Sequence, residues 1–444
     1  MRETVKHLKQ RSMILLVALS LGCGDSNNRK SYGESVPLMD AVHENEIAED
    51  TSPATDLSAD DSSQPEDDPG GMEETRTDPS DSTQDLPQVD SEVPPPLAPS
   101  TEEIALHYAP IWYQDTANGG PDNVGAKADV PTTADYDGDL QHNNNWDALP
   151  GKKIRPALYY GITVSETHYF LTYSQYHPRD WEIICPGLTG ACHEGDMESV
   201  WIVAKRAKTG FGKVMFVRAH HHGETTTWSN DSKIGEKVTL LSGIDFEDLE
   251  GSITAKQSDS QSHVRIFSEA HGHGTSPCTA QELLLKPFGI VNVSCPDSSG
   301  RTFPGGDGIK FIPTLDEAAF YKAGTENSDK AVEYGLVPIS ETLWQWRAQV
   351  GVNQMFRDKD PFIYLGAQGD PFVSAGPIGS HFDVDQFFND DLTGSAPWSR
   401  TLDGSEQGDV FLDPAWAYKK WLNLNQNWSL KYTYHPYLDV VETP

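Results

Sequence analysis

The chain has 444 residues, and its 67 acidic against 33 basic side chains give a formal net charge of −34 at pH 7. A protein that binds a nucleic-acid backbone needs clustered Lys and Arg side chains, and no segment supplies them, so the sequence predicts no nucleic-acid partner. No apolar run reaches about eighteen residues, so the sequence predicts no helix that spans a membrane.

Residues 1–22 predict an export signal. Four basic and one acidic side chain precede a largely apolar run from Met13 to Leu21, which is the layout of a secretory signal peptide. The next pair, Gly22-Cys23, resembles the end of a bacterial lipoprotein signal. That resemblance implies that Cys23 becomes the acylated first residue and fixes an exported protein to the bacterial cell envelope, at the outer membrane or facing the periplasm. An ordinary cleaved signal with an incidental cysteine is the alternative.

Residues 23–100 differ sharply from the rest of the chain. They hold twenty acidic and three basic side chains, and Tyr32 is their one Trp, Tyr or Phe residue. Such a segment buries too little apolar surface to offset the entropy of ordering, and its like charges extend it. We therefore expect an acidic disordered stalk that holds the following domain away from the membrane. An acidic tail that binds a partner is the alternative.

Beyond residue 100 the composition becomes that of a folded protein, with enough chain for one large domain or two small ones. Short runs rich in β-branched or aromatic residues are separated by clusters of Gly, Asn, Asp and Pro, which predicts strands. The runs are 157–164, 168–173, 199–204, 213–219, 237–241, 262–268 and 289–293. Their spacing predicts a mainly β fold over residues 101–300, an antiparallel β-sandwich with long loops.

Residues 301–444 are expected to form a C-terminal extension. Helical periodicity appears near 314–323, 341–348 and 413–422, so we expect a few peripheral helices that pack on the sandwich. Asp413-Pro414 is a typical helix start, with the acid as the cap and proline in the first turn.

Four further cysteines favour disulfides, because their number is even and the chain is predicted to be exported. They are Cys185, Cys192, Cys278 and Cys295. Pairing nearest neighbours closes the shortest loops and costs the least entropy, so we predict Cys185–Cys192 and Cys278–Cys295. Thiolate ligation of a metal is the alternative, although no Cys-x-x-Cys spacing supports it.

Several segments within residues 105–275 resemble one family when they are taken in order. They are 108–113 (YAPIWY), 129–131 (DVP), 135–139 (DYDGD), 143–146 (NNNW), 168–173 (HYFLTY), 193–200 (HEGDMESV), 217–223 (VRAHHHG) and 268–274 (SEAHGHG). The series resembles the vacuolar protein sorting-associated protein 62 family and its bacterial relatives. The block His193-x-x-Asp196-x-Glu198 is also similar to the heptapeptide of the necrosis- and ethylene-inducing-like proteins. Those are β-sandwich toxins that hold a divalent cation and recognise a sphingolipid head group, so the resemblance implies a cation site and a ligand of that class.

The same block has the chemistry of a cation site. Asp196 and Glu198 are two residues apart at the start of a predicted strand, so their carboxylates can share a face, where they repel unless a cation or a proton lies between them. With His193 they offer mixed oxygen and nitrogen ligands, which suit Mg²⁺, Mn²⁺, Ca²⁺ or Zn²⁺. A disulfide-closed loop upstream would bring Asp180 close as a further ligand. The alternative is that the two acids cap loops or pair with arginines.

Histidines at two predicted strand ends add candidate ligands. His220 and His222 would share one face of their strand, and His271 and His273 one face of theirs. Neutral imidazoles are good cation ligands, and a histidine can also act as a general base. We select His222 and His271 as the additional ligands, although a lone histidine is more often a surface or core residue.

Asp135, Asp137 and Asp139 alternate around Gly138 and form a candidate calcium loop, because oxygens at this spacing begin an EF-hand loop. The glycine stands at the fourth position instead of the sixth, and Trp146 stands where the twelfth position of an EF-hand needs Glu. The loop is therefore no EF-hand, and a polar turn is the favoured interpretation.

The leading hypothesis is a lipid-anchored, exported β-sandwich protein that holds a divalent cation and recognises a polar ligand such as a lipid head group or a glycan. A metal-dependent hydrolase would share the same ligands, because a bound cation lowers the pKa of water and a neighbouring histidine can take its proton. A structural surface scaffold without a ligand is the third hypothesis. The sequence indicates no catalytic residue and no oligomeric state.

Overall fold

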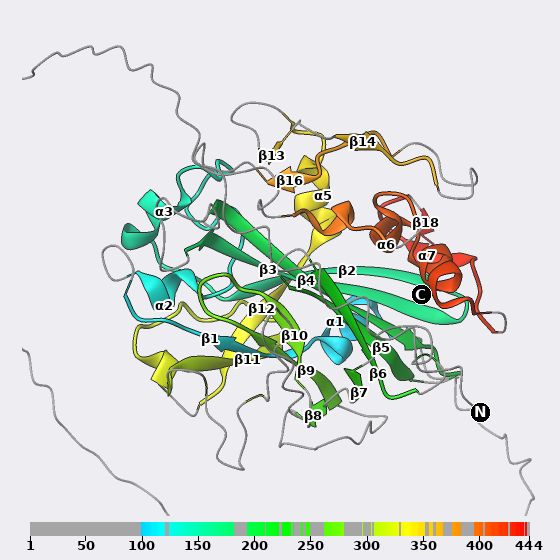
Figure 1. The fold of residues 1–444 in the computed structure, drawn as a ribbon, viewed down its shortest axis with the longest axis horizontal. Helices are drawn as coiled ribbons and strands as arrows, with labels where there is room; N and C mark the ends of the chain where they lie inside the picture. Colours follow the sequence, from blue (N-terminus) through cyan, green and yellow to red (C-terminus); the bar gives the residue numbers. More distant parts are fainter. Residues whose placement is uncertain are drawn as a thin grey trace, which may run out of the picture. The chain divides into compact units, whose positions relative to one another are not determined.

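Figure 1 shows a computed structural model of the chain, coloured from blue at the N-terminus to red at the C-terminus. The structure describes residues 99–441, with the exception of 120–123, 182–192, 209, 222–223, 232–233, 235–240, 243–245, 249–261, 279–294, 296–302, 304–305, 328–329, 351–354, 358–360, 367–374, 383–394, 403–404, 425–426 and 439. The predicted signal, nearly all of the predicted stalk, and the predicted sites at Cys23, Cys185, Cys192 and His222 therefore lie outside the described residues.

In that part of the chain the strands form one 14-stranded sheet and two small two-stranded sheets. The large sheet contains β1 (Ile111–Asp115), β2 (Ala157–Ser165), β3 (His168–Asp180), β4 (His193–Lys205), β5 (Lys213–His221), β6 (Glu224–Ser229), β7 (Leu241–Ser242), β8 (Phe246–Asp248), β9 (Ser262–Ser268), β10 (Thr275–Pro277), β11 (Gly308–Thr314), β12 (Val332–Pro338), β17 (Tyr432–His435) and β18 (Val440–Val441). Its main order is β10-β9-β1-β11-β12-β2-β3-β4-β5-β6-β7. The small sheets pair β13 (Phe356–Arg357) with β16 (His381–Phe382) and β14 (Phe362–Ile363) with β15 (Pro377–Ile378).

The prediction of a mainly β fold is confirmed, but the prediction of an antiparallel sandwich is wrong. Parallel pairing joins β1 to β9, β12 to both β11 and β2, and β6 to β7, whereas the run from β2 to β6 is antiparallel. The sheet also curls like a barrel, because β10 at one end of the order packs against β5 near the other. Alternating hydrophobicity predicts that a segment is a strand, but it does not say which strand lies beside it.

The side chain of Gln175 crosses the inside of this curled sheet. Gln175 lies on β3, and its Nε2 atom donates to Ser268 Oγ of β9 at 2.6 Å and to Thr275 Oγ1 of β10 at 2.9 Å. The same nitrogen donates to the carbonyl of His273 at 2.8 Å. These buried hydrogen bonds hold the turn between β9 and β10 against β3, which becomes important for the site.

The central strands β3 and β4 are covered on both faces. On one face Leu171 of β3 and Ile202 of β4 join the main core, which also contains residues of α1 (Thr101–Tyr108), β1 and β11. On the other face Phe170 of β3 lies in a second core with Tyr418, and their rings stack at 6.4 Å between centroids. Because both faces are buried, any polar side chain on these strands needs a partner inside the protein.

The helices among the described residues are short. Besides α1 they are α2 (Gly125–Ala128), α3 (Asn145–Ala148), α5 (Leu343–Trp346), α6 (Asp409–Leu412) and α7 (Pro414–Leu422), with 3₁₀ turns η2 (Leu149–Gly151), η4 (Thr325–Asn327), η5 (Ile339–Glu341) and η7 (Pro397–Ser399). Of the expected helices, 413–422 corresponds to α7 and 341–348 contains α5. The helix expected at 314–323 is wrong: β11 ends at Thr314, and the irregular chain that follows is tied to the rest by a hydrogen bond from Tyr321 N to the Ile154 carbonyl at 2.8 Å.

The C-terminal third does more than pack on a completed sheet, because β11 and β12 are inserted between β1 and β2. The predicted Cys278–Cys295 disulfide is confirmed, with the two Cα atoms 5.4 Å apart, and both residues are buried beside β1 and β9. No helix in the described residues combines the length and the hydropathy that crossing a membrane requires.

Candidate functional site

The polar end of the β3–β4 pair carries the same residue spacing twice. His177-x-x-Asp180 ends β3, and His193-x-x-Asp196 begins β4. The strands pair antiparallel, with His177 opposite Asp196 and Asp180 opposite His193. Each histidine therefore lies across from the aspartate of the other segment, and all four residues are buried.

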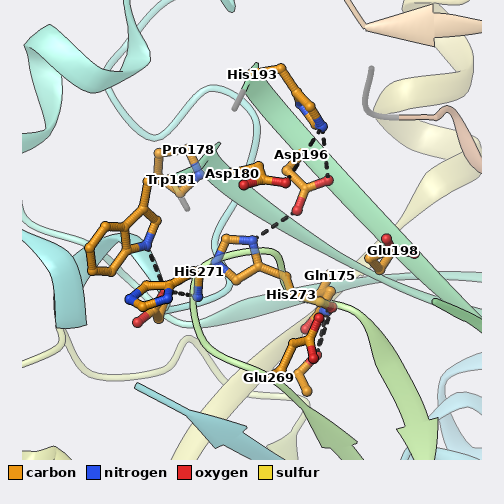
Figure 2. A network of polar contacts seen from close by, with 12 residues as sticks. Gln175, Pro178, Asp180, Trp181, His193, Asp196, Glu198, Glu269, His271 and His273 are labelled. Atoms are coloured by element: carbon orange, nitrogen blue, oxygen red, sulfur yellow. Dashed lines mark hydrogen bonds and ion pairs between the residues drawn. The ribbon is translucent and has the colours of Figure 1, made fainter. Parts of the chain in front are cut away.

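His193 lies between two carboxylates, as Figure 2 shows. Its Nε2 atom is 4.0 Å from Asp180 Oδ2 and 4.0 Å from Asp196 Oδ1, whereas its buried Nδ1 atom has no hydrogen-bond partner among the described residues. Burial lowers the pKa of His193, although the nearby Asp196 opposes that shift. The ring is therefore held neutral, which is the form that can bind a cation.

His273 contributes a second imidazole from the turn that follows β9. Its Nδ1 atom lies 2.8 Å from Asp196 Oδ2, and its Nε2 atom lies 3.2 Å from Asp129 Oδ1. Burial by itself would lower the pKa of His273, but the hydrogen bonds to Asp129 and Asp196 outweigh it and raise the pKa to about 10. In this state His273 is an imidazolium that donates to both carboxylates.

The ring of His177 stacks on the ring of His273, with centroids 3.6 Å apart and planes 7° from parallel. His177 is 0% exposed, and neither of its ring nitrogens has a hydrogen-bond partner in the described part of the chain. Burial, and then the proximity of His273, hold its pKa well below the usual range. Potential ligand atoms of His177, Asp196 and His273 all lie within 4.8 Å of one another.

Asp129 holds the turn that carries His273. Its Oδ1 atom accepts from the backbone N–H of His271 at 3.0 Å and from Trp181 Nε1 at 2.8 Å, and its Oδ2 atom accepts from Ala117 N at 2.8 Å. His271 and His273 both have positive φ, 70° and 53°, a conformation that costs a non-glycine residue roughly 1–2 kcal/mol. The carboxylate of Asp129 stabilises this turn against that strain, and such strain is common at functional sites.

Gly195 places Asp196 correctly within β4. It has a φ of 69°, which breaks the alternation of side chains between His193 and Asp196. A Cβ atom at this position would lie 2.7 Å from His142 Nδ1. Gly195 is therefore needed both for its backbone conformation and for the close approach of the His142 ring.

Glu198 belongs to a different cluster from the other predicted ligands. Its Oε2 atom is in contact with Nδ1 of His220 on β5, and that nitrogen also accepts a hydrogen bond from Arg400 at 2.8 Å. Figure 2 shows Glu198 further along β4, away from His193. Arg400 comes from the chain after η7, so the C-terminal third reaches this part of the molecule.

The structure thus brings Asp180, His193 and Asp196 together and places two other predicted ligands elsewhere. Glu198 lies beside His220, as described. His271 packs its ring edge-on against Trp181 at 4.1 Å between centroids, on the far side of His273 from Asp196 (Figure 2). The expected strand face shared by His271 and His273 does not exist, because β9 ends at Ser268 and both histidines lie in the turn.

The candidate calcium loop has the hydrogen bonds of a polar turn. Asp137 Oδ1 accepts from Asp139 N at 3.3 Å, and Asp139 Oδ1 accepts from Gln141 N at 2.8 Å. The carbonyl of Asp135 accepts from Gly138 N at 2.9 Å, where φ is 98°. The carboxylates of Asp137 and Asp139 are thus used within the loop itself, as expected for a turn.

Sequence reasoning missed His177 and Asp129, and of the candidate histidines 271 and 273 it selected His271 instead of His273. One signal was available for His177, because His-x-x-Asp occurs both at 177–180 and at 193–196, and the two copies flank a connection between consecutive strands. Asp129 carried no such signal, since it lies 144 residues from its partner His273.

No family model and no curated protein matches this chain. The solved structure described as "Toxin fold for microbial attack and plant defense" is 17% identical, with 46% of this chain and 74% of that chain covered and a TM-score of 0.24. "Crystal structure of non-toxic HaNLP3 protein" is 14% identical, with 38% and 77% covered and a TM-score of 0.20. "NLPPya in complex with glucosamine" is 17% identical, with 38% and 76% covered and a TM-score of 0.20. These are proteins of the necrosis- and ethylene-inducing-like type that the His193 block resembles, whereas no match supports the vacuolar sorting resemblance. At these TM-scores the likeness carries no argument about function.

Proposed function

We propose that this protein holds a divalent cation at the polar end of the β3–β4 pair and uses it to bind a polar ligand such as a lipid head group or a glycan. The observation that carries the proposal is His177, a fully buried imidazole beside the carboxylate of Asp196, neither of whose nitrogens has a well-aligned hydrogen-bond partner among the described residues. A buried polar group without a partner costs about 1–3 kcal/mol. A cation bound here would satisfy it and would separate the carboxylates of Asp180 and Asp196.

The spacing of the donor atoms suits one cation. Ligands that each lie about 2.0–2.5 Å from an ion can be separated by up to about 5 Å, and the group of His177, Asp196 and His273 falls within 4.8 Å. His193 adjoins the Asp196 carboxylate at 4.0 Å and lies 4.0 Å from Asp180. Since imidazole makes up much of this donor set, Zn²⁺ suits it better than Ca²⁺, Mg²⁺ or Mn²⁺, which prefer oxygen ligands.

The protonation of His273 decides whether its ring can bind the cation. Its Nδ1 atom donates to Asp196 Oδ2 at 2.8 Å, so a cation that uses this nitrogen must displace the proton. His273 otherwise remains outside the ligand shell and orients Asp196 through the hydrogen bond, as neighbours of metal ligands commonly do. In both arrangements Asp196 is the central ligand.

Metal analysis of the purified full-length chain tests the proposal. We expect the wild type to retain a divalent ion near one equivalent after dialysis at neutral pH, whereas Asp196→Asn and Asp180→Asn lose it. Asp147→Asn, at an exposed acid outside the proposed ligand set, is the matched control and should keep the ion. A wild type that carries no divalent ion, even after incubation with Mn²⁺ or Zn²⁺, would contradict the cation site.

The ligand is identified with a binding screen of the metal-loaded protein. Lipid vesicles and glycans are the main panel, and it includes glucosamine and mannosamine, which NLPPya binds in two of the similar structures. Chelation should abolish binding of a true ligand, and binding that persists in full without the metal would separate the ligand from the cation site.

A metal-dependent hydrolase is the second candidate, because His193 is held neutral by burial and a neutral imidazole can serve as a general base. The chain's own residues would then bind the ligand, orient it and accept a proton at His193. A screen with chromogenic esters and phosphoesters distinguishes the candidates, since metal-dependent turnover that is lost in His193→Gln would replace the pure binding function.

We also propose that the protein is exported and anchored to the cell envelope through Cys23. The basic and apolar signal before that cysteine supports this, and so does the Cys278–Cys295 disulfide, because disulfides persist mainly in oxidising compartments. Incorporation of a labelled fatty acid into the wild type but not into Cys23→Ala is the expected result. Equal release of both proteins from membranes by salt would contradict the anchor.

A further inference from the structure

Arg400, Arg218 and His220 form a cluster, here called the arginine cluster, that the cation site does not use. Arg218 and His220 are two residues apart on β5 and so share one face of that strand. Arg400 reaches them from the segment after η7, and its guanidinium donates to His220 Nδ1 at 2.8 Å. The contact of Glu198 with the same ring joins the cluster to β4, two residues from Asp196.

Among the described residues, no carboxylate is hydrogen-bonded to the Arg400 guanidinium. In the described residues its side chain has one hydrogen-bond partner, the imidazole of His220, which carries no formal charge when neutral. Arg218 donates to Thr225 Oγ1 at 2.5 Å and lies over the ring of Trp421 at 5.0 Å. Arg218 lies on the same face of β5 as His220, and its positive charge acts on Arg400.

The electrostatics agree with this geometry. Burial, and then the charge of Arg218, lower the pKa of Arg400 to about 9, while Asp196 acts in the opposite direction. Arg400 remains charged at neutral pH, and Asp196 is near enough to influence it. Arg218 is 8% exposed, and Arg400 is partly buried.

We propose that Arg400 and Arg218 form an anion subsite beside the cation site, and that the ligand of this protein carries a phosphate group. The inference rests on the proposed function, because it places the phosphate next to the bound cation. Arg is suited to this role, since its planar guanidinium can donate two parallel hydrogen bonds to a phosphate. A bound phosphate would give the Arg400 guanidinium a charged hydrogen-bond acceptor in addition to His220.

Titration calorimetry of the full-length, metal-loaded chain with inorganic phosphate tests the subsite at constant ionic strength. We expect Arg400→Gln to weaken phosphate binding at least tenfold. Arg400→Lys should weaken it less, because lysine keeps the charge but cannot donate two parallel hydrogen bonds. Arg206→Gln is the matched control: Arg206 is also partly buried, but it bonds the Ser165 carbonyl at 2.9 Å on β2, and its removal should leave phosphate binding unchanged. Wild-type affinity in a folded Arg400→Gln protein would overturn the subsite.

Thermal unfolding of each variant separates a binding role from a bracing role. If Arg400→Gln does not fold, Arg400→Lys and Arg218→Lys carry the test, because both retain the charge. A brace alone would lower the melting temperature without a selective loss of phosphate binding, and that result would also overturn the proposal.

Two sources of phosphate are compared in parallel, glucose 6-phosphate in solution and vesicles of phosphatidylcholine with phosphatidic acid. Binding to the vesicles that falls in Arg400→Gln assigns the group to a lipid, and binding to the sugar phosphate alone assigns it to a soluble ligand. Wild type that binds neither these nor inorganic phosphate would refute the subsite.

Repeating the inorganic phosphate titration with EDTA distinguishes the anion subsite from the cation site. The difference in phosphate affinity between wild type and Arg400→Gln should persist without metal even if the protein never held a cation.

Discussion

The two halves of the β3–β4 pair share one antiparallel register but have opposite chemistry. In the apolar half, Leu171 pairs with Ile202 and Tyr173 with Val200, and their side chains fill the main core. In the polar half, the same register sets His177 against Asp196 and Asp180 against His193. The comparison shows that strand pairing fixes the positions, while the side-chain types decide whether a position becomes core or site.

The halves also differ in what they contribute to stability. The apolar half stabilises the fold by removing hydrocarbon from water. The polar half buries carboxylates and imidazoles, which is costly unless each charge has a partner. Functional chemistry in the second half therefore depends on stability supplied by the first.

The largest loss of stability is expected from the apolar half. Ile202→Ala should lower the free energy of unfolding by about 2–5 kcal/mol, because it leaves a cavity in a fully buried position. Urea denaturation measures the change, and Ile202→Val, expected to cost about 0.5–1.5 kcal/mol, is the matched control. The metal content per folded molecule should stay at the wild-type value in both variants. Loss of the metal in folded Ile202→Ala would show that the halves are not independent.

His435, a histidine outside the site, has a lowered pKa, whereas the pKa of His273 is raised. His435 of β17 is buried, its Nε2 atom lies 2.8 Å from the Leu412 carbonyl, and burial lowers its pKa to about 4 despite that contact. Because this folded-state pKa lies below the ordinary value, its contribution to stability is complete above about pH 6.5 and is lost as the pH falls toward 4.

His435→Gln should therefore make the free energy of unfolding less sensitive to a fall in pH. Between pH 7.5 and pH 5 the wild type should lose about 2 kcal/mol more than the variant, measured by urea denaturation at both pH values. His273, whose pKa is raised by two carboxylates, has no such acid sensitivity. Equal losses in wild type and His435→Gln would mean that His435 is not held neutral by the fold.

Gly195 lies between His193 and Asp196 in the polar half of the β3–β4 pair. Its replacement should have a smaller effect on stability than the changes at Ile202 and His435. Gly195→Ala is expected to cost about 1–2 kcal/mol, because alanine resists the positive φ and its Cβ atom would meet His142. Gly138→Ala is the matched control, since Gly138 also has positive φ but open space around it. The difference between the two variants measures the contact with His142, and only Gly195→Ala should lower cation affinity.

The apolar half was predictable from the sequence, whereas the polar half was predictable only in part. The bounds predicted for 262–268 coincide with β9, and 157–164 matches β2 to within one residue, because alternating apolar side chains mark a strand. β3 and β4 extend beyond their predicted ends into 174–180 and 193–198. Those extensions are rich in polar side chains and lack the pattern, so the pairing of the two His-x-x-Asp segments could not be seen.

The remaining site residues depend on long-range geometry. His273 and Asp129 lie in a turn and a loop, and they meet only because the sheet curls and Gln175 ties the turn to β3. Arg400 reaches His220 across 180 residues of sequence. Local propensity carries no information on contacts of this kind, nor on the parallel strand pairings, which the sequence predicted wrongly.

His177→Leu should have the smallest effect on stability and the most selective effect on function. Replacing a buried imidazole that has no well-aligned hydrogen-bond partner among the described residues with a hydrocarbon side chain removes a desolvation cost, so the free energy of unfolding of the metal-free protein should change by less than about 1 kcal/mol. Cation affinity should fall by at least about tenfold, since the variant loses a proposed ligand. His168→Leu is the matched control, because His168 is buried beside Trp428 at the opposite end of β3, and it should keep the wild-type affinity. A His177→Leu protein that is strongly destabilised yet still binds the cation would reverse the assignment, making His177 part of the core and not of the site.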